Sequence, residues 1–153
     1  MRTYEVPTRV QWRGDLRGRA EVEGKDPLFV GAPPEFQGPE GIWTPEDLFV
    51  QALESSLMLT FVNLCTVEGI ELLSYSSKAS GRLEKTTSGL AFGWVVITPL
   101  IQARATEEQV LQLIQRAHEL SMIRRSVACE VAIYPEILGL DPDAPVAISS
   151  FPE

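Results

Sequence analysis

The chain is poor in the residues that build disulfide frameworks and metal centres. Its 153 residues include two cysteines, Cys65 and Cys129, and a single histidine, His118. A structural zinc site needs three or four ligands, and the two cysteines form no C-x-x-C pattern, so we expect no metal and no other cofactor. No apolar signal segment follows Met1. Isolated cysteines without a signal peptide are typical of the reducing cytoplasm, which is the expected location.

Positive charge is also scarce. The chain has 13 Lys and Arg residues and 21 Asp and Glu residues, which gives a formal net charge of −8. Nucleic acids and anionic membrane surfaces bind to cationic faces, and the Arg124–Arg125 step is too short to form one. We therefore expect neither a nucleic-acid partner nor a membrane partner. The length is that of a single domain with its own core, predicted over 1–153.

A helix-start signature precedes an unusually apolar segment. Thr44 can cap the helix, Pro45 suits its first position, and two acids follow at the positive end of the helix dipole. Apolar side chains from Leu48 to Leu64 then cover every side of the helical wheel. Because polar residues such as Glu54 and Asn63 interrupt the run, we predict a buried central helix and not a membrane span. A chain of this size rarely encloses such a helix, so a second subunit is expected to cover part of it.

The remaining segments predict strands on both sides of this helix and a second, amphipathic helix. The expected elements are, in order, two strands within 1–30, a loop rich in proline and glycine over 31–43, the central helix ending at Glu68-Gly69, strand material over 70–80 and 81–85 around a turn, a strand over 90–98 closed by Pro99, a helix opened by a capping box from Thr106 to Gln109, a strand within 126–134, and a loose tail from Leu140. The order ββ–α–ββ–α–β defines an α+β domain.

Two pairs of polar side chains are candidates for chemistry. Ser55 and Ser56 lie in the middle of the apolar helix, either because small residues let another helix approach closely or because a reaction takes place there. His118 and Ser121 are three residues apart on one helical face, close enough to each other to act as a base and a nucleophile. No G-x-S-x-G motif surrounds either serine, and a surface or interface histidine is the alternative.

Three motifs together resemble the OsmC/Ohr family, the osmotically inducible and organic-hydroperoxide-resistance proteins. They are Gly38-Pro-x-Gly-x-x-Thr44-Pro45-Glu46-Asp47-Leu48-Phe49-x-x-Ala52-Leu53-x-x-Ser56-Leu-x-Leu-Thr60, then Gly69-Ile-Glu-Leu…Tyr75-x-x-x-Ala79-x-Gly81, and Ala117-His118-x-x-Ser121-x-Ile123-x-x-Ser126. The resemblance covers most of 10–135. It implies an α+β fold with a long central helix, formed as an intertwined homodimer in which two central helices lie between sheets.

The resemblance also implies an activity, the thiol-dependent reduction of organic hydroperoxides at the subunit boundary. In the family, one cysteine attacks the peroxide, a second resolves the sulfenate as a disulfide, and an arginine paired with a glutamate activates the first thiolate. The attacking position falls on Ser56, the resolving position on Ser121 and the glutamate on Glu46. Leu16 occupies the place expected for the arginine and Arg17 is one residue away, a slip that reverses the face of a strand.

A serine hydroxyl stays protonated near neutral pH and has no sulfenate chemistry, so we expect a homologue of the family whose peroxidase activity is lost or severely reduced. We expect a protein that binds or senses a hydrophobic ligand, such as a lipid-like acid or peroxide, in an interfacial pocket. Its polar end would be formed by Ser56, Ser121 and Glu46, with Arg17 or Arg13 as counter-ion.

Three alternatives remain open at this point. The first is a working peroxidase of the oxidative stress response that uses Cys65 or Cys129, although Cys65 lies about half a helical turn out of phase with Ser56 and about 13 Å along the axis. The second is a serine hydrolase that uses Ser56 or Ser121 with His118. The third is a purely structural paralogue without a pocket.

Overall fold

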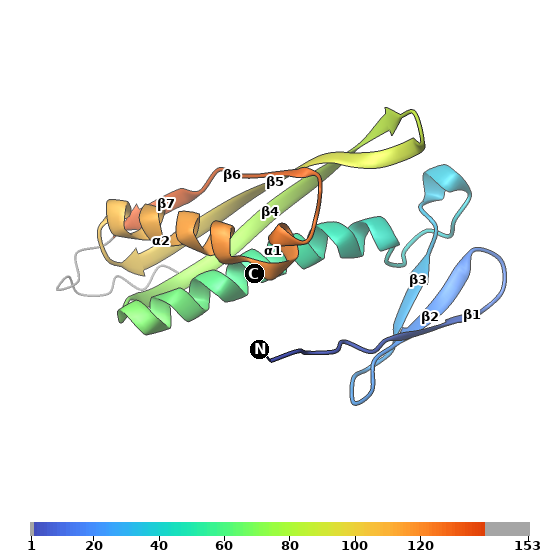
Figure 1. Ribbon diagram of the computed structural model, residues 1–153, viewed down its shortest axis with the longest axis horizontal. Helices are drawn as coiled ribbons and strands as arrows, with labels where there is room; N and C mark the ends of the chain where they lie inside the picture. The colour runs from blue at the N-terminus through green and yellow to red at the C-terminus, as the bar shows by residue number, and fades with distance from the viewer. Residues whose placement is uncertain (1, 140–153) are drawn as a thin grey trace. The chain divides into compact units, whose positions relative to one another are not determined.

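A computed structural model describes residues 2–139 of the chain (Figure 1). These residues belong to two compact units, Met1–Phe49 and Val50–Glu153, each with its own β-sheet. The single domain expected over 1–153 stays a prediction. The loose tail expected from Leu140 lies outside the described residues.

The first unit contains a three-stranded antiparallel sheet. Its strands are β1 (Arg9–Trp12), β2 (Arg17–Glu21) and β3 (Leu28–Gly31), paired in the order β1-β2-β3. We expected two strands in this region and the structure has three. The two turns form at Gly14 and Gly24, which take positive φ values of 90° and 76° that few other residues tolerate.

The helix α1 (Pro45–Glu68) begins and ends as the sequence predicts. The Thr44 hydroxyl accepts a hydrogen bond from the Asp47 amide at 3.1 Å, and the Asp47 carboxylate accepts one from the Thr44 amide at 2.9 Å. At the other end, Gly69 takes a left-handed φ of 68° that stops the helix. The preceding loop contains one short 3-10 helix, η1 (Pro34–Phe36), and no other helix or named strand between 32 and 44.

The second unit is built on a long antiparallel hairpin. Strand β4 (Glu71–Thr86) pairs with β5 (Gly89–Arg104) along nearly their whole length (Figure 1). Two short strands, β6 (Glu130–Ile133) and β7 (Glu136–Gly139), then lie parallel to β5 on its other edge. The predicted strand within 126–134 corresponds to β6, whereas β7 was not predicted.

Two residues that we expected to end strands lie inside them. Gly81 is in the middle of β4, where an added Cβ would lie 2.7 Å from a ring carbon of Phe92 and 2.8 Å from a methyl group of Val50, so glycine permits a close approach there. Pro99 is inside β5, between the residues that pair with β6 and those that pair with β7. The ladder on that edge is interrupted at this point, so a residue without an N–H is tolerated.

The amphipathic helix α2 (Glu107–Leu120) confirms the predicted capping box. The Thr106 hydroxyl accepts from the Gln109 amide at 3.2 Å, and the Gln109 side chain accepts from the Thr106 amide at 3.0 Å. A short helix, α3 (Met122–Arg125), follows. The core of this unit takes side chains from both long helices and from β5, namely Leu53, Leu57, Phe61, Val95, Ile97, Ile101, Val110, Ile114 and Ala117.

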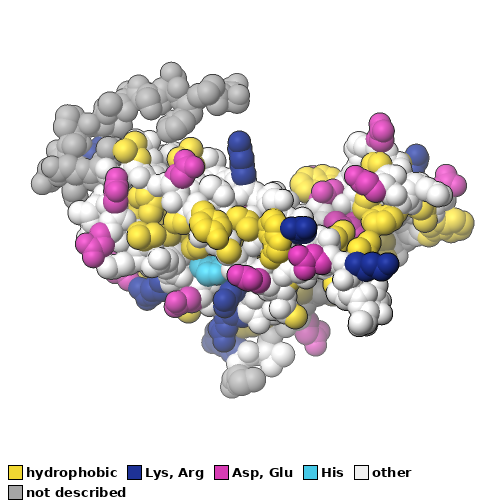
Figure 2. All heavy atoms as spheres, turned by 90° about the horizontal axis from the view of Figure 1, so that it is seen from above, with side chains coloured by type: hydrophobic (Ala, Val, Ile, Leu, Met, Phe, Trp, Pro, Cys, Tyr) yellow, Lys and Arg dark blue, Asp and Glu magenta, His cyan; other side chains and the backbone are white. Residues whose placement is uncertain are grey.

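Helix α1 is long and apolar enough to cross a membrane by length and composition. It nevertheless packs against the sheet of its own unit, with the rings of Phe61 and Tyr75 5.8 Å apart. One chain does not enclose it, because only 28% of its most apolar 18-residue stretch is buried. Leu59 and Val62 are exposed on one side. On one face of this unit, hydrophobic side chains gather in a band (Figure 2).

Candidate functional site

The structure brings Ser56 and Ser121 together. Ser56 lies on α1 and Ser121 at the junction of α2 and α3, and their Oγ atoms are 2.8 Å apart although 65 residues separate them in sequence. Ser121 is only 1% exposed, whereas Ser56 is half-buried. The two hydroxyls therefore form a hydrogen-bonded pair with one accessible member.

Local structure fixes both members of this pair. The Ser121 amide donates to the Ala117 carbonyl at the end of α2, and the Ser121 hydroxyl accepts from the Arg124 amide at 3.4 Å as the cap of α3. The Ser56 carbonyl accepts from the Thr60 hydroxyl at 2.7 Å, one turn along α1. The neighbouring Ser55 instead donates to the Gln51 carbonyl of its own helix at 2.6 Å. Of the two adjacent serines, only Ser56 is thus bonded to a distant element.

His118 is not bonded to either serine. Burial lowers the pKa of His118, and the charge of Arg124 adds to this, while the Val131 backbone and the Glu119 carboxylate act in the opposite direction. Within residues 2–139, no hydrogen bond links the imidazole to Ser56 or Ser121. A serine nucleophile needs a base within hydrogen-bond reach, and this part of the chain provides none at the pair.

The two cysteines are free thiols outside the serine pair. Burial raises the pKa of Cys65 to about 11, and a hydrogen bond with the backbone offsets this only in part. Such a thiol is almost wholly protonated near neutral pH, whereas the thiolate is the nucleophilic form. Cys129 is half-buried and is not joined to Cys65.

Glu46 lies in the first turn of α1. Its Oε2 atom is buried and has no hydrogen-bond partner among the described residues. Buried polar atoms are nearly always paired with protein or with water, so this oxygen is available to a water molecule or to another donor.

Arg17 is the first residue of β2, and its side chain takes part in no ion pair or hydrogen bond within residues 2–139. Arg17 lines a cavity of about 330 Å³, together with Arg13, Phe29 and Ile42. Arg13 donates to the Gln11 side chain at 2.8 Å. Of the two arginines that the sequence offers as counter-ions, Arg17 therefore has the free guanidinium group.

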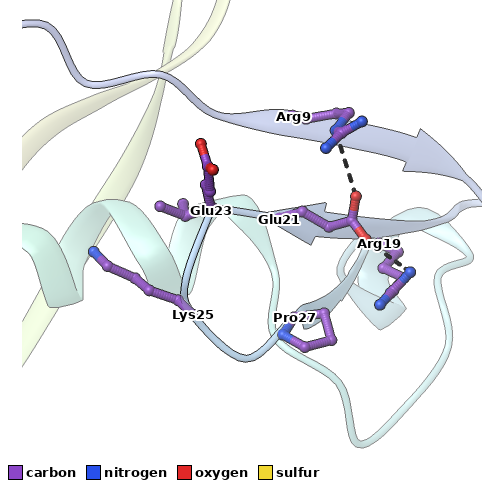
Figure 3. Close-up of a pocket in the computed structure, with 7 residues that line it drawn as sticks. Arg9, Arg19, Glu21, Glu23, Lys25 and Pro27 are labelled. Atoms are coloured by element: carbon purple, nitrogen blue, oxygen red, sulfur yellow. Dashed lines mark ion pairs between the residues drawn. The ribbon is translucent and has the colours of Figure 1, made fainter.

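The other two arginines of this sheet are already paired. Glu21 binds Arg19 at 2.7 Å and Arg9 at 3.5 Å, in a separate cavity of about 450 Å³ (Figure 3). The Glu21 carboxylate pairs with both guanidinium groups, and Glu23 adds a second negative charge to a lining that also contains Lys25, so the charges of this cavity largely offset one another. Arg17 is thus distinguished from Arg19, two residues along the same strand.

The sequence analysis did not identify the structural role of a buried carboxylate on α1. Glu54 is 9% exposed and accepts hydrogen bonds from the Ser77 hydroxyl of β4 at 2.5 Å and from the Gln51 side chain at 2.9 Å. The Tyr75 hydroxyl beside it is buried, and burial raises the pKa of Tyr75 to about 12, with the charge of Glu54 adding to the shift and the nearby Ser77 hydroxyl opposing it. An acidic residue in an otherwise apolar helix could have indicated a buried hydrogen bond. The sequence analysis interpreted it only as an interruption of the apolar segment.

Replacing Glu54 should test how strongly this contact anchors α1 to β4. Glu54→Ala is expected to lower the free energy of unfolding by about 2–3 kcal/mol, because it removes a charged acceptor from a buried hydroxyl. Glu54→Gln keeps one acceptor and should cost about 1 kcal/mol. Urea unfolding measures both.

The control for Glu54 is Glu68→Ala on the same helix. Glu68 forms an exposed ion pair with Arg116, so its loss should cost no more than about 0.5 kcal/mol. If Glu54→Ala were no more destabilising than Glu68→Ala, the buried contact would not anchor the helix.

The chain belongs to the OsmC-like protein family, which it matches over residues 38–136. An OsmC-like protein of unknown function from Vibrio cholerae is 26% identical, with a TM-score of 0.79 over 89% of this chain and 100% of that one. No curated protein sequence matches the chain significantly.

Two further solved structures share the fold at lower identity. The organic hydroperoxide resistance protein OsmC of Legionella pneumophila is 20% identical, with a TM-score of 0.73 over 90% of this chain and 98% of that one. The organic hydroperoxide resistance protein OhrB of Bacillus subtilis is 17% identical, with a TM-score of 0.62 over 88% of this chain and 98% of that one. The resemblance inferred from the sequence is confirmed, and α1 is the core helix of an α+β OsmC-like fold.

Proposed function

We propose that this chain is an OsmC-like protein that binds or senses a hydrophobic ligand and has lost the reduction of organic hydroperoxides. The single observation that carries the proposal is the Ser56–Ser121 pair, with its hydroxyl oxygens 2.8 Å apart. The sequence resemblance implies the attacking and resolving cysteines of the family at these positions. On that assignment, two hydroxyls in contact would keep the geometry of a two-thiol centre without its chemistry.

The protonation of the two serine hydroxyls decides whether they can act as nucleophiles. A cysteine thiol is a few per cent thiolate at neutral pH, whereas a serine hydroxyl is protonated and needs a base to act as a nucleophile. No such base bonds to Ser56 or Ser121 within the described residues. The sulfenate and disulfide steps require sulfur at both positions. The pair is therefore suited to hydrogen bonding.

Two charged groups of the first unit, Glu46 and Arg17, are further candidates for ligand binding. The Glu46 carboxylate has a buried oxygen without a partner, and Arg17 has a guanidinium group without an acid among residues 2–139. The buried Glu46 oxygen can accept a hydrogen bond from a ligand or a second subunit, and the exposed Arg17 guanidinium group can bind an anionic group. Arg13, already bonded to Gln11, is the weaker candidate for the counter-ion.

The pocket is proposed to form in a homodimer located in the cytoplasm. Exposed apolar side chains on α1, such as Leu59, are the support for a second copy, because a core helix is expected to be covered. The free state of both cysteines fits a reducing compartment.

Thiol reactivity tests the loss of peroxidase activity. With a pKa of about 11, the Cys65 thiol should remain unmodified when the protein meets stoichiometric cumene hydroperoxide at pH 7, and it should begin to react only as the pH approaches 11. Mass spectrometry of the Cys129→Ser variant, which isolates Cys65, measures this directly. Rapid oxidation of Cys65 at pH 7, or turnover of hydroperoxide with a dithiol, would instead establish the alternative of a peroxidase that uses other thiols.

A further inference from the structure

The hydrogen bond between the two serines has a direction that burial determines. A hydroxyl carries one proton to donate and two lone pairs to accept. The Ser121 oxygen already accepts from the Arg124 amide, and at 1% exposure its own proton has no access to bulk water. In the described part of the chain, the acceptor within hydrogen-bond distance is the Ser56 oxygen at 2.8 Å.

The opposite direction would leave a buried proton unpaired. If Ser56 donated to Ser121, the Ser121 hydroxyl would receive two hydrogen bonds and its own proton would have no acceptor in this part of the chain. A buried donor without an acceptor is costly and rare in folded proteins. Ser56, which is half-buried, can place its own proton towards solvent or a ligand.

We infer that Ser121 donates to Ser56 and that the pair therefore offers a bound ligand one hydrogen-bond donor, the Ser56 hydroxyl. The inference rests on the proposed ligand-binding function and deepens it by naming the ligand class. The polar end of the ligand carries an acceptor oxygen, as in a ketone, an ester, a carboxylate or a peroxide. Ser56 determines this specificity, and Ser121 is the residue that positions its proton.

A thiol in place of the Ser56 hydroxyl tests, without any ligand, whether the Ser121 hydroxyl can donate a hydrogen bond to position 56. In Ser56→Cys, a proton donated by Ser121 stabilises the thiolate and should lower the thiol pKa relative to the same thiol without this donor. Removing the donor in Ser56→Cys/Ser121→Ala should raise that pKa by about one unit, a tenfold loss of thiolate. Thiolate absorbance against pH, recorded as a difference from the parent chain, measures both. An unchanged or lower pKa in the double variant would overturn the direction.

A pair of ligands of the same shape tests the acceptor requirement. The probes are 2-octanone and 2-methyl-1-octene, in which a methylene group replaces the carbonyl oxygen. Ser56→Ala should weaken the binding of 2-octanone about fivefold, the contribution of one neutral hydrogen bond, and leave the alkene unchanged. Ser55→Ala is the matched control, because the Ser55 hydroxyl bonds within its own helix. Calorimetric or NMR titration gives the constants.

The two experiments separate the inference from the function on which it depends. If Ser56→Ala weakens both ligands equally, or neither, the donor role of Ser56 is wrong even though a ligand binds. If neither probe binds the parent chain, the proposed pocket is wrong for such ligands and the ligand class is wrong with it, while the thiol titration still tests whether Ser121 can donate to position 56.

Discussion

The Ser56→Cys/Ser121→Cys variant is expected to reduce organic hydroperoxides that the parent chain leaves intact. The two oxygen atoms are 2.8 Å apart, so sulfur atoms at these positions need to approach by less than about 1 Å to reach the disulfide length of about 2.05 Å. With a dithiol reductant, turnover should exceed that of the parent by about 100-fold or more, because a thiolate replaces a protonated hydroxyl. A ferrous-oxidation assay of residual cumene hydroperoxide measures it.

The expected chemistry balances with the groups that the variant contains. The thiolate at position 56 attacks one peroxide oxygen, which breaks the O–O bond and releases the alcohol after protonation. The resulting sulfenic acid condenses with the thiol at position 121, releasing water and forming a disulfide. Two electrons from the external dithiol then regenerate both thiols. Each step requires sulfur where the parent chain has oxygen.

The control carries the same number of added thiols in the wrong place. Ser55→Cys/Ser121→Cys moves the first thiol one residue along α1, which turns it about 100° around the helix axis. It should show no turnover above the parent. Activity in the parent equal to that of the Ser56 variant would contradict the proposed loss and direct attention to Cys65 and Cys129. If the Ser56→Cys/Ser121→Cys variant showed no turnover, the positions of Arg17 and Glu46 would explain the missing activity.

The sequence predicted the features that local chemistry decides. The cap at Thr44, the stop at Gly69 and the capping box at Thr106 each depend on residues within one turn of the helix end, and all three are present. The closeness of Ser56 and Ser121 is different, because 65 residues separate them. The sequence indicated it only through the resemblance to the family motif, which implies the reacting cysteines at both positions.

Features that depend on distant neighbours were missed. In the sequence alone, Gly81 predicts a turn. Only the close approach of Phe92 and Val50 explains why a glycine is inside β4. Likewise, the role of Glu54 depends on its hydrogen bond with Ser77 across the helix–sheet contact. Neither partner is identifiable from spacing, since the register of a helix on a sheet is set by packing of the whole surface.

The predicted place of the arginine illustrates the limit of an argument from alternation at a strand end. We reasoned that a slip from Leu16 to Arg17 would reverse the face of a strand. In the structure β2 begins at Arg17, and Leu16 lies in the turn before it. Strict alternation applies only inside a strand, so the slip gives no ground for rejecting Arg17.

Introducing a charge at Leu59 is expected to dissociate the proposed dimer. Leu59 is 62% exposed in the single chain, and Val62 lies three residues further along the same side of α1. Two copies that cover this stripe would each bury one Leu59, and a fully buried leucine contributes about 1.5–3 kcal/mol. Leu59→Glu should therefore weaken the dimer by at least about 100-fold and give monomers at micromolar concentration.

The matched control is Leu111→Glu on α2. Leu111 is 38% exposed and its neighbours Glu108 and Gln112 are exposed too, so a further carboxylate on that surface should leave the assembly intact. Sedimentation equilibrium of the parent and both variants measures the dissociation constants. A monomeric parent would contradict the dimer and leave the apolar side of α1 without a partner. Dimers in Leu59→Glu as tight as in the parent would place the interface on another face, away from this stripe.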